Sequence, residues 1–553
     1  MTFNEPRISV VGGKHVHVQV GDEISKDGID DVHRLYYALA RMEGVSEVVP
    51  AYCSVAFTFR PELTSLRSIE TEIADAWKKR DTLESLSKEV KVPVCYGGVF
   101  GQDLEWVADR AGINKDEVVR LHSNKTYTCA MLGFSPGFVY LDEVDPKIRV
   151  PRLDVPRTKV PSGSVGIADS QTGIYGVESP GGWRIIGRTP ITMFDANLSP
   201  PCPVRPGDRV KFEPVTVSEF DFIKPKKTKE RKPLRGVPAL EVEQPGLFAT
   251  IQGQPRSDFR HFGVPRSGGL DVISQYQANY MVGNPTTAAV LEILGGHFKA
   301  KALVDLIACV TGADAPLTVR GKIVSQYAPL IVHEGDELTI GRPVRGFINY
   351  LAIAGGLDGE SALGSTSTYV RAGFGGLEGR AVRLGDRLMV EAIPEQVESP
   401  VVPVTERTKM DDRNIRATRG PFPAASYESE GVFGVQFEIT ESSDRMGYRL
   451  KRSDLDGPRI KGGGTLTFPT YPGYVQVPPE GFPIVLQQDC QTTGGYVVTA
   501  VVLSEDMGTF SQLGPGGLCI FNEVDVDSAV EEEKKFQAKL AKYSLGTARD
   551  QVR

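Results

Sequence analysis

Long apolar runs are missing from this sequence, and their absence argues against a transmembrane or secreted protein. No run of about 18 apolar residues occurs, so no transmembrane helix is expected. The N-terminal residues MTFNEPRISVVGGKHVHV contain no long apolar segment, so a signal peptide is not expected either. The 7 cysteines are scattered and include no C-x-x-C pair, which favours reduced thiols in a cytoplasmic protein over a disulfide framework.

Several familiar motifs are also missing. The sequence holds no G-x-x-x-x-G-K-[ST] P-loop, no G-x-S-x-G nucleophile elbow and no H-E-x-x-H zinc motif. The net charge of −7 provides no global positive field, so neither nucleic acid nor a membrane is expected as a partner. His15 and His17 stand one residue apart on an expected strand, and we interpret them as a surface pair rather than a metal site. No protein metal site is predicted.

Turn-forming residues are abundant instead. The chain of 553 residues, with 59 Gly and 38 Pro, is too long for one core, so we expect two main parts with three or four domains. Many tight turns are typical of short-stranded β-barrels. The predicted fold class is therefore mainly β, with an α+β N-terminal domain. Its strand and helix patterns over 15–97 follow the order βαββαβ, which predicts a ferredoxin-like domain ending in the strand KVPVCY.

Local signals place the remaining elements. Helices are predicted near 103–110 and 115–122, the second with Asn114 in a capping box, near 270–282, and over 527–543. The basic segment KPKKTKERKPLR is interpreted as a solvated linker rather than a nucleic-acid or membrane contact. The predicted domains are 1–97, 98–222, 244–393 and 405–525, with a linker over 223–243 and a helical tail over 526–553.

A Gly-Asp turn recurs before three apolar runs. Gly accepts positive φ, and Asp can bond the local backbone, so the pair favours a tight turn. We interpret the repeat as several barrels that are built alike. Its three copies are PGDRV at 206–210, EGDEL at 334–338 and LGDRL at 384–388.

The densest polar cluster lies between residues 156 and 190. Arg157, Lys159 and Arg188 supply cationic donors, and successive Gly N–H groups can form an anion nest. The cluster predicts a phosphate or carboxylate site. Its other polar members are Ser162, Ser164, Gln171, Thr172 and Thr189. Upstream of it, the stretch GFSPGF at 133–138 is equally consistent with a packed barrel loop and with a binding loop.

The second half of the chain adds three polar stretches. Ser267, before the helix near 270–282, can hold an anion on the helix dipole or serve as a plain N-cap. The stretch RAGFGGLEGR offers a backbone cradle between Arg371 and Arg380. Asp444 and Arg445 are predicted either to pair structurally or to contact a ligand.

The stretch around Asp444 and Arg445 is considered together with a later polar stretch, QQDCQTTGGY at 487–496. Asp489 and Gln491 can bind an amide, because together they offer an acceptor to its N–H and a donor to its C=O. Thr492 and Thr493 are ligand-binding candidates beside them. Cys490 has no histidine in the same stretch, so we do not interpret it as a nucleophile.

In this order the stretches resemble a pair of known families. GFSPGFVYL, PRTKVPSGSVGIA and QTGIYGVESPGGWRIIGRTP, within 6–215, look like the allophanate-hydrolase-subunit-1 type domain, which is the B subunit of 5-oxoprolinase. GVPRSGGLD, RAGFGGLEGR, SSDRMGYRL and QTTGGY, within 244–523, look like the subunit-2 type domain, which is the C subunit of 5-oxoprolinase. The resemblance implies a fusion of the two, with cyclophilin-like β-barrels in both parts.

The resemblance implies a small set of activities. In 5-oxoprolinase, the B and C subunits use ATP, with Mg²⁺, to activate 5-oxo-L-proline, and a separate A-subunit homologue completes hydrolysis to L-glutamate. The alternatives are a carboxyltransferase acting on urea or a related amide, with biotin carried on a partner, and a kinase-inhibitor-type regulatory module. The SPGF and QTTGGY forms, and the lack of an A-M-K-M biotinyl segment after residue 523, favour the first. The stretch QGQPR at 252–256 departs from the Q-D-x-G-R that is usual in the C-subunit family and bears on the substrate.

The expected mechanism is phosphorylation of the lactam oxygen by ATP, which makes the ring carbonyl open to water. The resemblance and the residue chemistry together assign phosphoryl binding to Arg157, Lys159 and Arg188, and lactam binding to Asp489 and Gln491. His122 is the candidate for acid–base chemistry. The sequence leaves the oligomeric state open, a homo-oligomer included.

Overall fold

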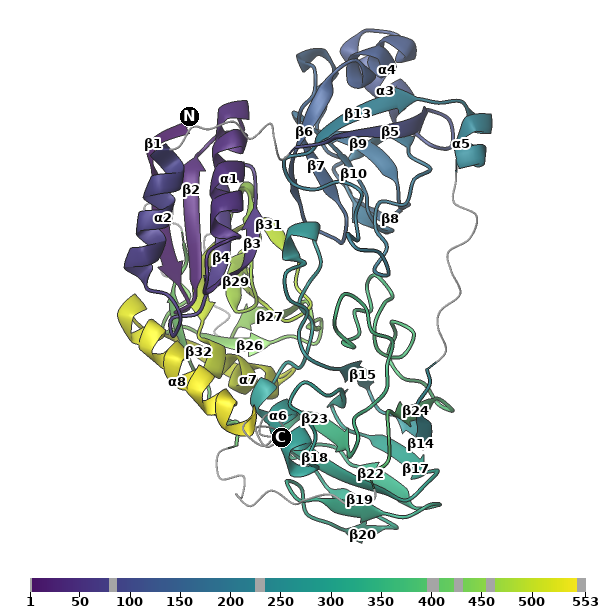
Figure 1. Ribbon diagram of the computed structural model, residues 1–553, viewed down its shortest axis with the longest axis vertical. Coiled ribbons are helices and arrows are strands. Elements are labelled where there is room, and N and C mark those ends of the chain that lie inside the picture. The colour runs from purple at the N-terminus through teal and green to yellow at the C-terminus, as the bar shows by residue number, and fades with distance from the viewer. Residues whose placement is uncertain are drawn as a thin grey trace, which may run out of the picture.

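The computed structural model describes residues 2–78, 87–223, 234–394, 407–421, 431–453 and 463–544. They form an α+β N-terminal domain, a first barrel, a two-sheet region and a second barrel followed by a tail helix (Figure 1). The predicted fold class, mainly β with an α+β N-terminal domain, is confirmed. Within these ranges, no helix has the length and apolar character needed to cross a membrane.

The N-terminal domain has a ferredoxin-like layout, but its edge strand is not the predicted one. The sheet order is β1-β2-β4-β3, and β1, from the N-terminus, takes the edge beside β2. The predicted last strand, KVPVCY, lies in β5 (Glu89–Tyr96) and pairs in the first barrel instead. That prediction was wrong because alternation marks a strand without showing which sheet it joins. The elements are β1 Thr2–Val11, β2 His15–Gly21, α1 Lys26–Leu39, β3 Val45–Pro50, β4 Ser54–Phe59 and α2 Leu66–Lys78.

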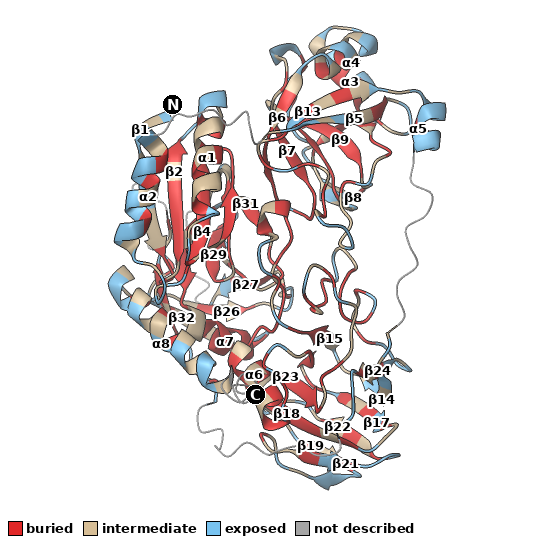
Figure 2. Ribbon diagram, viewed as in Figure 1, coloured by how far each residue is buried: buried red, intermediate tan, exposed pale blue. Residues whose placement is uncertain are grey.

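Strand β2 is buried along its length (Figure 2), although the sequence predicted a half-buried strand with a surface histidine pair. The second barrel covers the sheet face opposite α1 and α2. The His15 ring stacks on Tyr471 with centroids 4.3 Å apart, and His17 Nε2 lies 2.6 Å from the Tyr474 hydroxyl. Burial lowers the pKa of His17 to about 3. Both histidines are therefore packing groups between domains, and their predicted surface position is wrong.

The first barrel closes as β10-β7-β6-β13-β5-β12-β9. The predicted helices are present, and Asn114 Oδ1 accepts the Glu117 N–H at 2.8 Å, which confirms Asn114 as the cap. The Glu117 carboxylate accepts from Arg120, so the second half of the predicted capping box is not seen. A two-stranded ribbon, β8 with β11, extends from the barrel. The elements are α3 Leu104–Ala111, α4 Lys115–Ser123, β6 Thr126–Leu132, β7 Val139–Glu143, β8 Arg157–Val160, β9 Ser164–Ala168, β10 Gln171–Ile174, β11 Ser179–Gly181, β12 Arg184–Arg188, β13 Arg209–Pro214 and α5 Val217–Ile223.

The region predicted as a barrel over 244–393 consists of two sheets that enclose one core. One has the order β20-β19-β22-β17-β14-β24, and the other β15-β16-β23-β18-β21. Strand β14 (Val237–Pro245) belongs to the first of these sheets, so the predicted linker over 223–243 extends too far into the folded region. Most of the basic segment, 224–233, lies outside the described residues. The other elements are β15 Phe248–Gln252, α6 Val272–Met281, β16 Val290–Leu294, β17 Phe298–Ala302, β18 Leu306–Asp314, β19 Leu317–Val319, β20 Lys322–Ile323, β21 Leu330–Val332, β22 Glu337–Ile340, β23 Arg345–Ile353 and β24 Arg387–Val390.

The second barrel is closed by the pairing of β25 with β31, and β28 is attached to β31. The predicted tail helix is present as α8 (Val526–Ser544) and lies across the second barrel (Figure 1). The remaining elements are β25 Asn414–Arg419, β26 Gln436–Ile439, β27 Gly447–Arg452, β28 Gly464–Pro469, β29 Tyr474–Val477, β30 Ile484–Leu486, β31 Thr493–Val502, α7 Ser504–Leu513 and β32 Leu518–Glu523.

The three Gly-Asp turns have the predicted geometry. In each, the glycine has a positive φ and the aspartate carboxylate accepts the backbone N–H three residues earlier. The glycines are Gly207, Gly335 and Gly385, and the hydrogen bonds are Arg205 to Asp208, His333 to Asp336 and Arg383 to Asp386. Each turn precedes a strand, β13, β22 or β24, so the repeat is structural. Because β22 and β24 belong to one sheet of the two-sheet region, the interpretation of the repeat as several barrels built alike was wrong.

We predict that Gly13→Ala destabilises the protein. Gly13 has a φ of +75°, and a Cβ there would lie 2.3 Å from the Ala529 carbonyl oxygen of α8. We expect a loss of about 1–3 kcal/mol in the free energy of unfolding, because backbone strain and a clash act together. Urea denaturation measures it. Gly431→Ala, which meets no atom within 4 Å, is the matched control, and equal effects of the two changes would contradict the contact.

Candidate functional site

A cleft of about 730 Å³ lies between the two halves of the chain. Its size is within the range of small-molecule sites. The first half contributes residues 134–136 and 177–180, and the second half contributes residues from 369–372, 464–467 and 491–496. The stretches GFSPGF, SPGG, RAGF and QTTGGY, which are far apart in the sequence, therefore meet in one cavity.

The two halves contact each other directly at this cleft. The Thr493 hydroxyl accepts the Phe134 N–H at 3.1 Å, and a Cβ on Gly133 would lie 1.9 Å from the same oxygen. Only glycine fits at position 133 while Thr493 keeps this place. The Gly263 Cα also packs closely against the first half, since a Cβ there would lie 2.5 Å from the Ser135 carbonyl oxygen.

Gln491 lines the cleft from the second half. Its Nε2 donates to the Oε1 of buried Gln476 at 3.2 Å, and its backbone oxygen accepts the Thr470 hydroxyl at 2.8 Å. The contact to Gln476 uses one of the two amide N–H groups. The second N–H and the Oε1 of Gln491 are the kind of donor and acceptor that an amide ligand needs.

Two arginines face the cleft from opposite halves. Arg152 comes from the first half, and Arg371 from the second. Their side chains are 54% and 58% exposed, so both can reach a ligand. The sequence predicted Arg371 but missed Arg152 and Tyr369, which also lines the cleft. Arg152 lies outside the Gly-rich stretches, so no local pattern marks it.

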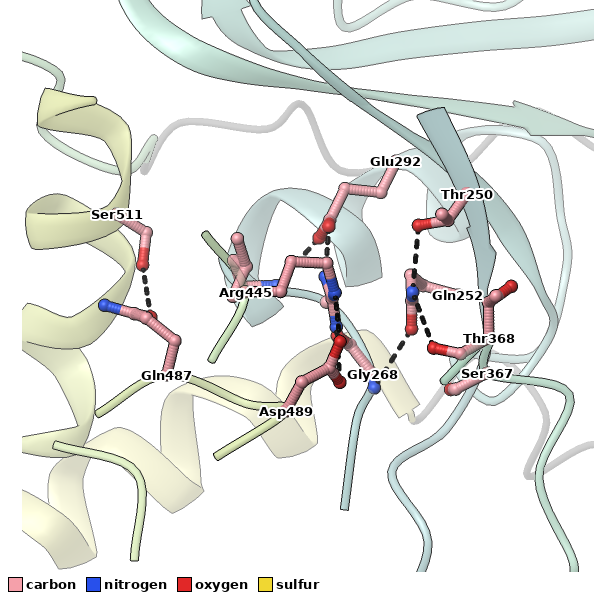
Figure 3. Close-up of polar contacts among 12 residues, drawn as sticks. Thr250, Gln252, Gly268, Glu292, Ser367, Thr368, Arg445, Gln487, Asp489 and Ser511 are labelled. Carbon is pink, nitrogen blue, oxygen red and sulfur yellow. Dashed lines mark hydrogen bonds and ion pairs between the residues drawn. The ribbon is translucent and has the colours of Figure 1, made fainter. Parts of the chain in front are cut away.

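A buried guanidinium anchors the loops that carry the cleft residues (Figure 3). Arg445 Nε donates to Asp489 Oδ2 at 2.8 Å, Nη2 donates to the Gly268 oxygen at 2.7 Å, and Nη1 contacts Glu292. Burial alone would lower the pKa of Arg445, but the carboxylates of Asp489 and Glu292 raise it above its usual value. The arginine is therefore charged and held by both acids.

The network continues through Gly268 to the QGQPR stretch. Gln252 Oε1 accepts the Gly268 N–H at 3.1 Å, while its Nε2 donates to the Thr250 hydroxyl at 2.9 Å (Figure 3). Arg256 is also buried, and its guanidinium bonds the backbone oxygens of Ala362 and Ser367. Gln252 and Arg256, the two residues of QGQPR that match the Q-D-x-G-R pattern of the C-subunit family, are therefore structural supports.

These contacts correct the roles predicted for Asp444, Arg445, Asp489 and Ser267. Arg445 pairs with Asp489 and Glu292, while Asp444 Oδ2 lies 3.9 Å from Arg371. Both carboxylate oxygens of Asp489 accept hydrogen bonds from Arg445, and Asp489 is not among the residues that line the cleft. Asp271 caps α6, so Ser267 is not the N-cap.

The predicted anion cluster of the first half does not converge on one point. Arg157 pairs with Asp103 at 2.8 Å, and Arg188 Nε donates to the Ser162 backbone oxygen at 2.8 Å. Lys159 is exposed and pairs with Glu178 at 2.9 Å. Each of the three cations contacts a protein group and none of them lines the cleft, so the structure does not bring them together around one phosphoryl group. Of the cluster's other members, Ser162 donates to Gly176, Gln171 and Ser164 lie in strands, and Thr172 and Thr189 are buried.

Two further candidate site residues, Arg380 and Thr492, are surrounded by other groups of the protein. Arg380 makes two hydrogen bonds to Asp386, and these bonds raise its pKa. Thr492 is fully buried. Burial raises the pKa of Cys490 to about 11, which agrees with its interpretation as a non-nucleophile.

His122 is enclosed in the first barrel. Its Nδ1 lies 2.8 Å from the Tyr96 hydroxyl, and its Nε2 lies 2.8 Å from the Thr172 hydroxyl. The side chain is fully buried, and burial lowers its pKa to about 3. It does not line the cleft, so the structure does not place it beside a ligand there.

Comparison with known proteins assigns both halves to one family. Residues 6–204 match the carboxyltransferase domain, subdomain C and D, and residues 262–523 match the carboxyltransferase domain, subdomain A and B. The crystal structure of TTHA0988 has 32% identity and a TM-score of 0.80, covering 92% of this chain and 99% of that one. The chain therefore belongs to the carboxyltransferase-domain family.

The two halves of the chain are similar to different curated proteins. The B subunit of 5-oxoprolinase from Bacillus subtilis is 36% identical over 230 residues, which are 39% of this chain and 95% of that protein. The C subunit of 5-oxoprolinase from Escherichia coli is 33% identical over 310 residues, which are 55% of this chain and 97% of that protein. Urea amidolyase of Saccharomyces cerevisiae is 29% identical over 311 residues, which are 53% of this chain but 17% of that protein. One polypeptide here carries the counterparts of the B and C subunits.

We predict that Arg445→Met is strongly destabilising. It would leave Asp489 and Glu292 buried without a counter-charge, and breaking a buried pair in this way costs about 3–5 kcal/mol. Chemical denaturation measures the loss. Arg419→Met removes an exposed pair with Glu523 and serves as the control, with an expected change below about 1 kcal/mol. A small effect of Arg445→Met would show that the network is not a main support.

The buried His122 also predicts a dependence of stability on pH. An unfolded chain takes up the His122 proton below its ordinary pKa of 6.5, whereas the folded chain does so only near 3, so the stability falls as the pH decreases through this window. In His122→Gln, proton uptake on unfolding at pH 5 should decrease by about one. Calorimetry in buffers of different ionisation enthalpy measures that uptake. Unchanged uptake at pH 5 would mean that His122 is not held neutral.

Proposed function

We propose that this chain is the B/C component of an ATP-dependent 5-oxoprolinase. In the cleft it phosphorylates the lactam oxygen of 5-oxo-L-proline, and a separate A-subunit homologue completes hydrolysis to L-glutamate. One observation carries the proposal: the cleft is built from the half that is similar to the B subunit and the half that is similar to the C subunit, and neither half forms it alone.

The chemistry explains why ATP is needed. Amide resonance makes a lactam carbonyl a weak electrophile and its oxygen a poor leaving group. In the proposed step the lactam oxygen attacks the γ-phosphorus, a new O–P bond forms, and the bond from that phosphorus to ADP breaks. The lactam nitrogen gives up its proton as the imidate-like phosphate forms. Water then adds at the ring carbon, and the C–N bond breaks as the nitrogen takes up protons. A second water releases inorganic phosphate from the resulting acyl phosphate and leaves glutamate.

The residues of the cleft suit this step. Gln491 can orient the lactam through its free N–H and Oε1, while Arg152, from the other half, can neutralise charge on the transferring phosphoryl group. ATP enters as its Mg²⁺ complex. Exposed rings of Phe134 and Tyr496, at 40% and 43%, offer apolar surface to the nucleotide base.

ATP hydrolysis with different amides tests the proposal. Purified full-length chain is assayed with 5-oxo-L-proline, urea or no amide, with and without an A-subunit homologue. We expect ADP release that depends on 5-oxo-L-proline, and glutamate formation only when the A-subunit homologue is present. The absence of lactam-dependent ATP hydrolysis under every pairing would overturn the proposal and favour a regulatory module.

A carboxyltransferase is the second candidate, because both family matches carry that description and urea amidolyase is a relative. It would transfer a carboxyl group from biotin on a partner to urea or a related amide. Activity with urea that requires a biotinylated partner would establish this alternative and contradict the first.

We predict that Gln491→Ala weakens the lactam-dependent reaction. Loss of hydrogen bonds to a partly buried amide costs about 1–3 kcal/mol, which corresponds to a decrease in kcat/KM for 5-oxo-L-proline of roughly tenfold to a hundredfold. Steady-state ATPase assays measure it. Gln254→Ala, whose side chain bonds Gly364 outside the cleft, is the control. If the two variants behaved alike, Gln491 would not contact the lactam.

A further inference from the structure

Arg371 differs from the other charged groups that line the cleft. These groups are Arg152, Glu178 and Arg371. Glu178 pairs with Lys159 at 2.9 Å, and Arg152 lies 3.4 Å from Asp169. For Arg371 the described residues offer only Asp444, whose Oδ2 is 3.9 Å away, beyond hydrogen-bond distance.

Asp444 is also committed elsewhere. Its Oδ1 accepts the Met446 N–H at 2.8 Å and the Gly447 N–H at 3.2 Å, so the carboxylate is fixed to its own turn. Among the described residues, Asp444 is thus the one ion-pair partner of Arg371 and lies too far away for a hydrogen bond, so the guanidinium N–H groups of Arg371 can donate to a ligand in the cleft. A planar guanidinium in this situation suits a carboxylate or phosphate, which it can bind through two parallel hydrogen bonds.

The neighbours of Arg371 favour the carboxylate over the phosphate. Arg371 and Gln491 line the same cleft, and the charges of Arg371, Asp489 and Cys490 all act on the hydroxyl of Tyr369, which places Arg371 near the stretch that carries Gln491. In 5-oxoproline the carboxylate is attached to the ring carbon next to the lactam nitrogen. A residue that binds the carboxylate must therefore lie near the group that binds the lactam.

We propose that Arg371 binds the carboxylate of the substrate and selects lactams that carry an anionic group beside the ring nitrogen. This inference rests on the proposed function and adds the basis of its specificity. Gln491 orients the amide, and Arg371 holds the ring by its carboxylate. Neutral amides such as urea gain nothing from Arg371, so it separates the two candidate substrate classes.

The test compares two ligands of similar size, of which one carries a carboxylate and the other a neutral carboxamide at the same position. Binding of 5-oxo-L-proline and of 5-oxo-L-prolinamide to the full chain is measured by calorimetry without ATP. We expect the wild-type chain to bind the carboxylate about tenfold more tightly than the amide, and Arg371→Gln to bind both alike. Arg371→Lys, which keeps the charge without the planar fork, should retain part of the preference.

Arg152→Gln is the matched control, because it removes an arginine from the other half at similar exposure. It should leave the preference for the carboxylate intact. An unchanged preference in Arg371→Gln, or its loss in Arg152→Gln, would overturn the inference. A rise in the KM for ATP with no change for 5-oxo-L-proline in Arg371→Gln would also overturn it, since Arg371 would then bind phosphate.

These outcomes are separate from the failure of the proposed function. If the wild-type chain bound neither ligand and hydrolysed no ATP in the presence of the A-subunit homologue, the proposed function itself would fail. If it bound 5-oxo-L-proline and turned over ATP while Arg371→Gln kept the full preference, only the assignment of Arg371 would be wrong.

Discussion

The buried ion network of Arg445 is the interaction on which the cleft depends. Arg445 precedes Met446, and Asp489 lies two residues before Gln491; both Met446 and Gln491 line the cleft. Glu292, on β16, ties this pair to the two-sheet region. The three charged side chains are buried, and each is stable there only while its partners are present. The ion network therefore holds the cleft loops of the second barrel against the two-sheet region.

The N-terminal domain holds the two barrels in place around the cleft. Its sheet packs on the second barrel through residues such as Val49 and Tyr474, while α1 reaches the first barrel, where His33 bonds the Ala130 oxygen at 3.0 Å. Helix α8 packs on the second barrel and on Gly13 of the N-terminal domain. Segments from both ends of the chain therefore lie side by side (Figure 1) and support a site that is built from its middle.

Local features of this fold could be predicted from the sequence, while partnerships between distant segments could not. The Asn114 cap and the Gly-Asp turns depend on neighbouring residues and were predicted correctly. The burial of β2 and the sheet of β5 depend on surfaces that come from other domains. The same limit applies to the site. Gln491, Thr493 and Arg371 lie at the cleft, whereas Arg157 and Lys159 pair with Asp103 and Glu178, which no motif indicates.

The central claim is that residues of both halves form one ligand site. Hydrogen exchange of the full chain with and without 5-oxo-L-proline and a non-hydrolysable ATP analogue tests it most directly. The account predicts that the backbone amides of 133–138 and of 491–496 gain protection together, since Phe134 and Thr493 meet at the cleft. Protection confined to one half, or protection only at segments outside the cleft, would contradict it.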